Sequence, residues 1–274
     1  MYLLLIRHGE SVDNIAGLYA GSRDSPLTNH GVLQARRLGA HLAKRRDAIG
    51  PIKKMFASNL QRAYRTAEAV ADAQSFTDTG MTEAQTHLEV VRLPELREKN
   101  FGSSEGKKFG ARTAASQGAA HSDAETRDSM KTRVGRFLDL HLAPVIDEHV
   151  TEDVAVVIVA HGIILGVLLR ELLSRYSTKP LDSVHGDFMA AWSNTGVLQV
   201  KIEPPSAEAM SSEQSRHRDS LKFTVQLTNN VDHLQGLKKT RGGIGSAKFD
   251  SRQRTMDSFF IPASKKRRLG DDEN

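Results

Sequence analysis

The stretch Tyr2-Leu-Leu-Leu-Ile6-Arg7-His8-Gly9-Glu10-Ser11 decides the fold of this chain. A short apolar run that ends abruptly in charge and glycine is typical of a buried central strand delivering its last residues to a ligand site. Glycine lets backbone approach a ligand closely, Arg7 supplies a planar guanidinium that matches phosphate oxygens, and a neutral His8 can attack phosphorus. The stretch therefore predicts a phosphate-handling histidine at the carboxyl end of a strand.

Strand-like and helix-like segments alternate along the chain, which predicts a three-layer α/β/α sandwich with a mostly parallel central sheet. After the first strand we expect strands at residues 52–58, 88–93, 154–160, 188–192, 196–202 and 221–227. Helices are expected at 28–46, 60–73 and 163–175, with an amphipathic helix that carries Met130, Val134, Phe137 and Leu138. Residues 103–124 resemble an inserted loop over a site, and residues 204–220 resemble a linker.

The composition is that of a globular protein, with 274 residues of which 39% are hydrophobic and 26% charged. The absence of cysteine excludes disulfides, thiolate metal sites and a cysteine nucleophile. The apolar stretch 154–173 is the candidate membrane span, but His161 and Arg170 interrupt it, and a buried strand followed by a helix explains it better. We therefore expect neither a membrane segment nor, from the short apolar start, a signal peptide.

The positive charge of the chain is concentrated at its carboxyl end. Residues 237–274 hold ten Lys or Arg and five Asp or Glu, which accounts for the whole formal charge of +5. Faces that bind nucleic acid collect Lys and Arg on a folded surface, so we expect no such face on the neutral remainder. These counts predict a folded domain at 1–236 and a disordered basic tail at 237–274.

Two internal segments carry charged residues that can join His8. In the segment 58–67 a strand end runs into a helix start, where Arg62 and backbone N–H groups can face an anion. In the segment 96–106, LREKNFGSSEG, Glu98 follows a strand, and a carboxyl group held in a partly dry site suits protonation of a leaving alkoxide. Taken alone, each is better explained as an ordinary solvated surface charge.

Two weaker signals complete the set. The run Val156-Val-Ile-Val-Ala-His161-Gly162 is a second buried strand that ends in His-Gly, and two such strands side by side in a parallel sheet would bring His8 and His161 to one edge. A core histidine satisfied by backbone is the alternative for His161. Asn14 and the Ala20-Gly21 loop can supply an amide and backbone donors.

Taken together, these residues resemble the histidine phosphatase superfamily, specifically the branch of cofactor-dependent phosphoglycerate mutase and the fructose-2,6-bisphosphatase-like enzymes. The resemblance spans about residues 1–236 and implies a phosphoglycerate mutase-like fold. Its motifs occur in the family's order: RHGES with Asn14, Asp24-Ser-Pro-Leu-Thr28 with Gly31 and Gln34-Ala35, the Arg62 segment, LREKNFG, the buried His-Gly, and Asn229 to Leu234 as a closing NxxxHL.

The resemblance also implies the roles of the site residues. His8 is implied as the nucleophile that becomes phosphorylated, and Glu98 as the general acid that later serves as the base for water. The residues implied to hold phosphoryl oxygens are Arg7, Arg62 and His161. Substrate contacts are expected from Ser11, Asn14, Ala20, Gly21 and Gly162.

The chemistry of phosphoryl transfer supports these roles. Transfer spreads charge over three oxygens, which two guanidinium groups and an imidazolium can stabilise without a metal. The sequence shows no metal-ligand spacing, so neither a metal nor another cofactor is expected.

The segment 102–106 bears on the choice between phosphatase and mutase. It reads GSSEG, where mutases resemble GxLQG followed by a longer insertion, so the chain is more similar to the phosphatases. A phosphatase acting on a small phosphorylated substrate is the favoured reading; a mutase-type transferase, or a scaffold with little catalysis, is the alternative. Several basic or polar groups could contact a second phosphate of the substrate: Lys99, Lys107, Lys108, Arg112 and the stretch near His185. The alternative, equally compatible with the sequence, is that they are solvated side chains.

The tail carries a motif of a different class. Gln253-Arg-Thr-Met256-Asp-Ser-Phe259-Phe260 fits Q-x-x-[ILM]-x-x-[FY]-[FY], which resembles the segment by which proteins dock on the replication sliding clamp, proliferating-cell nuclear antigen (PCNA). A one-turn helix would present Met256 and both aromatic rings as an apolar plug, with Gln253 in a polar pocket. The sequence thus predicts the clamp as a partner; a strip that packs on the body is the alternative.

A compact basic cluster follows the clamp motif at Lys265, Lys266, Arg267 and Arg268. Such clusters are typical of nuclear localisation signals or of phosphate contacts. On a disordered tail, recognition by importin is the favoured meaning, and a solubilising run of charge is the alternative. Both tail motifs predict a nuclear protein, with a cytoplasmic population also compatible.

Overall fold

A central sheet forms the core of the computed structural model, which describes residues 1–74, 88–110, 123–176, 192–204, 221–239 and 243–250. Its strands are ordered β3-β2-β4-β1-β5-β6. Their bounds are β1 Tyr2–Arg7, β2 Ile52–Ser58, β3 Val90–Leu93, β4 Ala155–Ala160, β5 Val197–Glu203 and β6 Lys222–Asn230. The first four strands of that order run parallel, and β5 is antiparallel to both β1 and β6.

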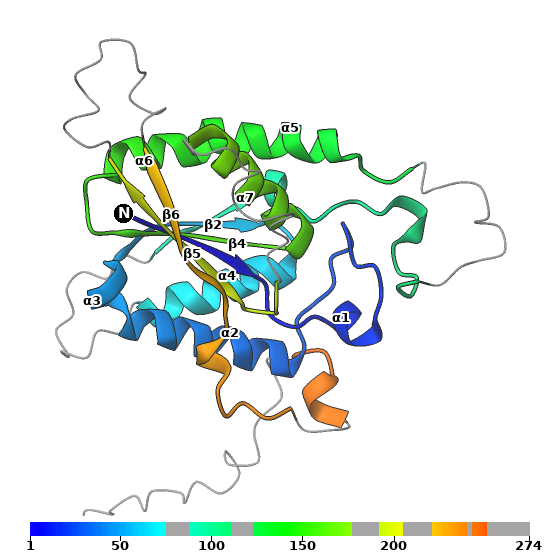
Figure 1. Cartoon of the computed structure of the whole chain (residues 1–274). Coiled ribbons are helices and arrows are strands. Elements are labelled where there is room, and N and C mark those ends of the chain that lie inside the picture. Colours follow the sequence, from blue (N-terminus) through cyan, green and yellow to red (C-terminus); the bar gives the residue numbers. More distant parts are fainter. Residues whose placement is uncertain (75–87, 111–122, 177–191, 205–220, 240–242, 251–274) are drawn as a thin grey trace, which may run out of the picture.

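Helices cover both faces of the sheet, which confirms the predicted α/β/α sandwich (Figure 1). One face packs against α2 (Asn29–Lys44), α3 (Arg46–Ile49) and α4 (Gln61–Gln74). The other face packs against α5 (Arg127–Phe137), α6 (Ala143–His149) and α7 (Gly162–Tyr176). Two separate apolar cores therefore lie above and below one sheet.

The central strands explain why both cores form. All six residues of β4 are buried, and because successive side chains alternate across a strand, they divide between the two cores. Val156 and Ile158 join the core beneath α5–α7, whereas Val157 and Val159 join the core beneath α2 and α4. A continuous apolar run is thus the sequence of a strand buried on both sides.

Some elements differ from the sequence prediction. The short helix α1 (Val12–Ala16) was not expected; Ser11 caps its amino end and Gly17, at φ 63°, ends it in the left-handed conformation. The amphipathic helix α5 continues through a π-turn at Leu138–Leu142 into α6. The predicted strand at 188–192 lies outside the described residues except for Trp192, which is not in a strand.

The folded part extends past the predicted end of the domain at residue 236. A 3-10 turn at Gly243–Ser246 packs against α2. Ala247 accepts a hydrogen bond from the Asn29 N–H, and the Phe249 N–H donates to Leu27. A disordered tail from residue 237 was therefore wrong for this segment, because backbone pairing holds it to the body; residues 251–274 lie outside the described part.

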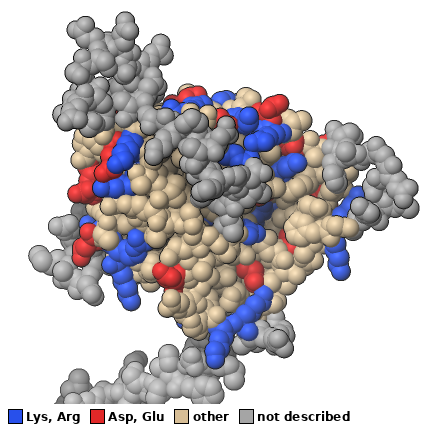
Figure 2. Space-filling view, in the orientation of Figure 1, with Lys and Arg blue, Asp and Glu red and all other residues tan. Residues whose placement is uncertain are grey.

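Charge is dispersed on the surface. In the face seen in Figure 2, Lys and Arg side chains are interspersed with Asp and Glu.

Among the described residues, no helix is long and apolar enough to cross a membrane.

Candidate active site

The carboxyl ends of β1 and β4 bring His8 and His161 together. Arg7 pairs with Ala160 across the two parallel strands, and the His8 N–H donates to the Ala160 carbonyl at 3.0 Å. The two imidazole rings, whose centroids are 4.9 Å apart, are both almost fully buried. The predicted meeting of two His-Gly strand ends at one edge of the sheet is therefore present in the structure.

A backbone contact fixes the tautomer of His8. Its Nδ1 lies 2.7 Å from the Gly9 carbonyl oxygen. A carbonyl can only accept, so Nδ1 carries the proton and Nε2 holds the free lone pair. Burial, followed by the charges of Arg62 and Arg7, lowers the pKa of His8 well below its usual value. The ring is therefore neutral at neutral pH, as a nucleophile requires.

His161 has the opposite tautomer. Its Nδ1 accepts a hydrogen bond of 3.1 Å from Arg62 Nε, and a guanidinium can only donate, so the ring proton is on Nε2. Within the described part of the chain, that Nε2 is buried without a partner. Burial and the charges of Arg62, His8 and Arg7 lower the pKa of His161. The imidazolium expected from the sequence is thus wrong for the free protein: His161 offers a neutral N–H donor.

Arg62 organises the site from inside the protein. Only 1% of its surface is exposed, and its Nη1 and Nη2 donate to the carbonyls of Arg23 and Gly21 at 2.6 and 2.7 Å. Burial lowers its pKa to about 10, against the opposing charges of Glu98 and Asp13, so it remains a cation at neutral pH. Its guanidinium therefore fixes both the His161 tautomer and the loop after α1.

Arg7 adds a second cation with an available donor. Its Nη1 donates to the Trp192 carbonyl, and its buried Nε has no partner among the described residues. Buried polar atoms normally have hydrogen-bond partners. Arg7 Nε and His161 Nε2 are thus two unsatisfied N–H groups beside His8, which is what an oxyanion site provides before its ligand arrives.

The other predicted substrate contacts lie around this centre. Asn14 and Ser11 form a capping box at the start of α1, and the Asn14 side-chain oxygen also accepts from Asn194 Nδ2 at 3.2 Å. With that oxygen occupied, the Asn14 NH₂ group is left for a ligand. Gly162 begins α7 directly after His161.

Ala20 and Gly21 act differently from the prediction. Both use carbonyl oxygens, which accept from the Arg23 N–H and from Arg62, so the backbone donors expected from this loop are not the contacts that the structure shows. Gly21 has φ 48°, and a side chain there would collide with Glu105 and Phe101.

Glu98 lies at the amino end of α7. Its carboxylate accepts from the Ile163 and Ile164 N–H groups at 3.2 and 3.1 Å, and from the Lys99 N–H at 2.9 Å. A helix amino end favours a negative charge. Because α7 starts immediately after His161, its amino end holds Glu98, the implied general acid, close to His161, which is implied to hold phosphoryl oxygens.

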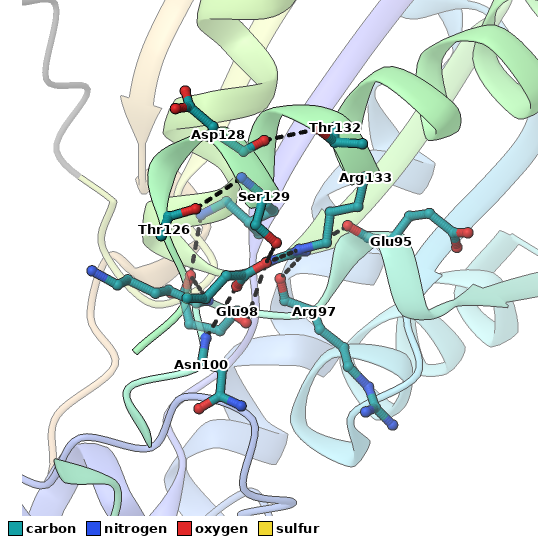
Figure 3. A network of polar contacts seen from close by, with 12 residues as sticks. Glu95, Arg97, Glu98, Asn100, Thr126, Asp128, Ser129, Thr132 and Arg133 are labelled. Carbon is teal, nitrogen blue, oxygen red and sulfur yellow. Dashed lines mark hydrogen bonds and ion pairs between the residues drawn. The ribbon is translucent and has the colours of Figure 1, made fainter. Parts of the chain in front are cut away.

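A third arginine holds the backbone that carries Glu98 (Figure 3). Arg133 on α5 donates to the carbonyls of Glu95 and Arg97, both at 2.6 Å, and more weakly to that of Glu98. It also forms a two-pronged ion pair with Glu125, with Nε–Oε1 at 2.7 Å and Nη2–Oε2 at 3.0 Å. Arg133 lowers the pKa of Glu125 despite its partial burial. Sequence reasoning missed Arg133 because nothing in the spacing of α5 links this residue to the carbonyls of Glu95, Arg97 and Glu98.

A cavity of about 470 Å³ opens beside this network. Ser22, Glu98, Asn100, Arg133 and Arg136 contribute to its wall. Its wall includes Glu98 but none of His8, Arg7, Arg62 and His161. Among the described residues, no group of three or more His, Asp or Glu is placed to hold a metal ion.

The loop before β5 donates hydrogen bonds to the backbone of His8, and the sequence analysis did not identify it. The Thr195 N–H donates to the Arg7 and His8 carbonyls, and Asn194 Nδ2 donates to the His8 carbonyl. Thr195 has φ 58°, which is strained for a β-branched residue and is typical of a functional loop. His233, within the NxxxHL segment, donates from Nε2 to Thr195 Oγ1 at 2.8 Å.

Comparisons with known proteins identify the family of this chain. Residues 3–203 match the family model of the histidine phosphatase superfamily (branch 1). A probable phosphatase of Schizosaccharomyces pombe is 30% identical over 93% of this chain and 78% of its own length. A probable phosphoglycerate mutase of Erwinia tasmaniensis is 32% identical over 63% of this chain and 75% of its own length. In structure, a mycobacterial hydrolase superposes with a TM-score of 0.61 at 24% identity, over 84% of this chain and 98% of that one.

Proposed function

This chain belongs to branch 1 of the histidine phosphatase superfamily, and on that premise we propose that it hydrolyses phosphomonoesters through a phosphohistidine at His8. The observation that carries the proposal is the tautomer of His8, whose Nδ1–H donates to Gly9 and whose Nε2 is free to attack. Membership of the family and the phosphatase-named relative establish a phosphatase-type enzyme; the covalent intermediate is our inference.

The first half-reaction transfers the phosphoryl group. His8 Nε2 forms a bond to phosphorus while the bond to the leaving oxygen breaks, and a proton that the phosphomonoester brings as its monoanion passes through Glu98 to that oxygen. Arg7 Nε and His161 Nε2 donate to the phosphoryl oxygens, so the negatively charged oxygens supply the hydrogen-bond acceptors that both N–H groups lack. Arg62 contributes its charge and holds His161 in the donor tautomer.

The second half-reaction releases phosphate. Glu98, now ionised, takes a proton from water as the water oxygen attacks phosphorus, and the N–P bond returns its electron pair to His8. Hydrolysis rather than transfer to a second substrate is favoured by the GSSEG segment, which departs from the mutase pattern.

Phosphate release from a panel of phosphorylated compounds tests the proposal. The panel contains sugar phosphates, phosphoglycerates, nucleotides and p-nitrophenyl phosphate, assayed with wild type and His8→Ala in the presence of chelator. We expect release by wild type and none above background by the variant. Equal release by the two proteins would overturn the role of His8, and transfer between phosphoglycerates without net release would establish the mutase instead.

We further propose that the tail delivers this enzyme to the sliding clamp in the nucleus. The support is the sequence of Gln253 to Phe260 and the basic cluster of residues 265–268, both outside the described residues. A pull-down with PCNA tests the first motif: the double change Phe259→Ala with Phe260→Ala should abolish capture, whereas alanine at residues 265–268 should preserve it. The same two variants, imaged in cells, should show the reverse pattern for nuclear accumulation.

A further inference from the structure

The segment that follows the NxxxHL motif reaches the nucleophile loop. Lys239 Nζ donates to Glu10 Oε2 at 2.7 Å, and Glu10 lies two residues after His8. The Glu10 side chain is 11% exposed, whereas that of Lys239 is 37% exposed. Residue 239 also lies beyond the region 3–203 that matches the family model. A part of the chain outside the matched domain thus contacts the loop that carries the proposed nucleophile.

Glu10 is itself tied to Thr28 by two further contacts. The Thr28 N–H donates to the Glu10 carbonyl at 3.0 Å, and Thr28 Oγ1 donates to Glu10 Oε1 at 2.8 Å. The same hydroxyl accepts from the Gly31 N–H and so caps α2. Gln34 Oε1 accepts the Glu10 N–H. Glu10 and Thr28, both buried, therefore form one rigid unit that joins the nucleophile loop to α2.

A second piece of the same segment pairs with that unit. Lys248 forms an antiparallel β-bridge with Thr28. The two hydrogen bonds on either side of it join Asn29 to Ala247 at 3.0 Å and Phe249 to Leu27 at 3.1 Å. The described residues 237–239 and 243–250, which we call the strap, thus meet the Glu10–Thr28 unit from two places. Just before the strap, Arg37 on α2 donates to the Gln235 carbonyl.

We propose that the strap positions the nucleophile loop, with Lys239 as a positioning residue whose ion pair with Glu10 sets the rate of phosphoryl transfer. This inference rests on the proposed function of His8.

The physical basis is the placement of the loop backbone. Glu10 is fixed through its N–H, its carbonyl and one carboxylate oxygen by Gln34 and Thr28. Lys239 neutralises the other oxygen, whose charge would otherwise be left half-buried beside the site. Ion pairs with one exposed partner contribute up to about 1 kcal/mol, equivalent to about a fivefold change in rate, and are screened by salt.

Kinetics of full-length variants test the strap. Lys239→Met should lower kcat for p-nitrophenyl phosphate by about two- to fivefold with little change in KM, because the loop and not substrate binding is disturbed. Lys239→Arg should restore the rate, and Lys238→Met, an exposed neighbour, should behave as wild type. In 1 M salt, where the screening length is about 3 Å, the gap should close.

Equal kcat for Lys239→Met and Lys238→Met at low salt would overturn the inference while leaving the phosphatase standing. If wild type released no phosphate, the proposed function would fail instead, and amide hydrogen exchange would still decide the strap. Lys239→Met should speed exchange in peptides that cover Gly9–Val12 and Leu27–Gly31, and Lys238→Met should not. Unchanged exchange in both peptides would refute the strap without reference to activity.

Discussion

The two strand ends Arg7-His8-Gly9 and Ala160-His161-Gly162 look alike in sequence but hold their histidines in opposite tautomers. His8 donates from Nδ1 to its neighbour's carbonyl and keeps a lone pair on Nε2, whereas His161 accepts at Nδ1 from Arg62 and keeps a proton on Nε2. One ring can attack phosphorus and the other can donate to its oxygens. The difference teaches that the partner of Nδ1, rather than the local motif, assigns the role of a histidine.

Removing His8 should produce the largest effect. Without a nucleophile, the covalent route is closed, and kcat should fall on the order of 10⁴-fold or more in His8→Ala. Wild type quenched in base during turnover of labelled substrate should carry acid-labile phosphate, and the variant should carry none. A labelled His8→Ala protein would show that another residue, and not His8, carries the phosphoryl group.

Removing His161 should be costly but not abolish the intermediate. His161→Ala loses one donor to the phosphoryl oxygens, which is worth about 10²- to 10³-fold in kcat, while the nucleophile remains. The variant should therefore still form acid-labile phosphoprotein, only more slowly. His149→Ala serves as the control, because His149 ends α6 beside Glu152, far from this network. Loss of labelling in His161→Ala would mean that His161 is the phosphorylated residue.

The main features of the site could be predicted from sequence because the ends of buried strands have a recognisable residue pattern. Apolar runs that end in His-Gly locate the edge of a parallel sheet, and β1 and β4 confirm that both runs are neighbouring strands. The tautomer and the charge of His161 could not be predicted, since they depend on a 3.1 Å contact with Arg62, 99 residues away.

The supporting residues were missed for a related reason. Thr195 and Arg133 act through backbone carbonyls, which every residue has, so no residue pattern marks their partners. The strap was assigned to a disordered tail because its composition is basic and polar, yet its backbone pairs with Leu27 and Asn29. A composition-based boundary cannot detect main-chain pairing.

Breaking the support of Glu98 should give an intermediate effect. Arg133→Met removes the donors to the Glu95 and Arg97 carbonyls and leaves Glu125 unpaired, so Glu98 should shift and kcat should fall about tenfold to a hundredfold. Because a lysine cannot form the two-pronged contact, Arg133→Lys should recover little. Lys131→Met on the same helix is the control. If Arg133→Met kept full activity with unchanged folding, Glu98 would be positioned by α7 alone.

The smallest effect concerns a third histidine, His233. It tests whether the fold keeps this ring neutral. Burial and the nearby His41 lower the pKa of His233 to about 4, so the folded protein keeps this ring neutral while the unfolded chain binds a proton below about pH 6.5. Since the unfolded state then holds more protons, the free energy of unfolding should decrease as pH falls from 6.5 towards 4. One such group contributes at most about 1.4 kcal/mol per pH unit.

Denaturant unfolding of wild type and His233→Gln at pH 7, 6 and 5 measures this contribution. Glutamine retains an N–H donor for Thr195 and cannot titrate, so the variant should lose less stability between pH 7 and pH 5 than wild type. The slope that remains includes His8, His161 and His41, whose pKa values are also lowered. Parallel pH profiles for the two proteins would mean that His233 is not held neutral by the fold.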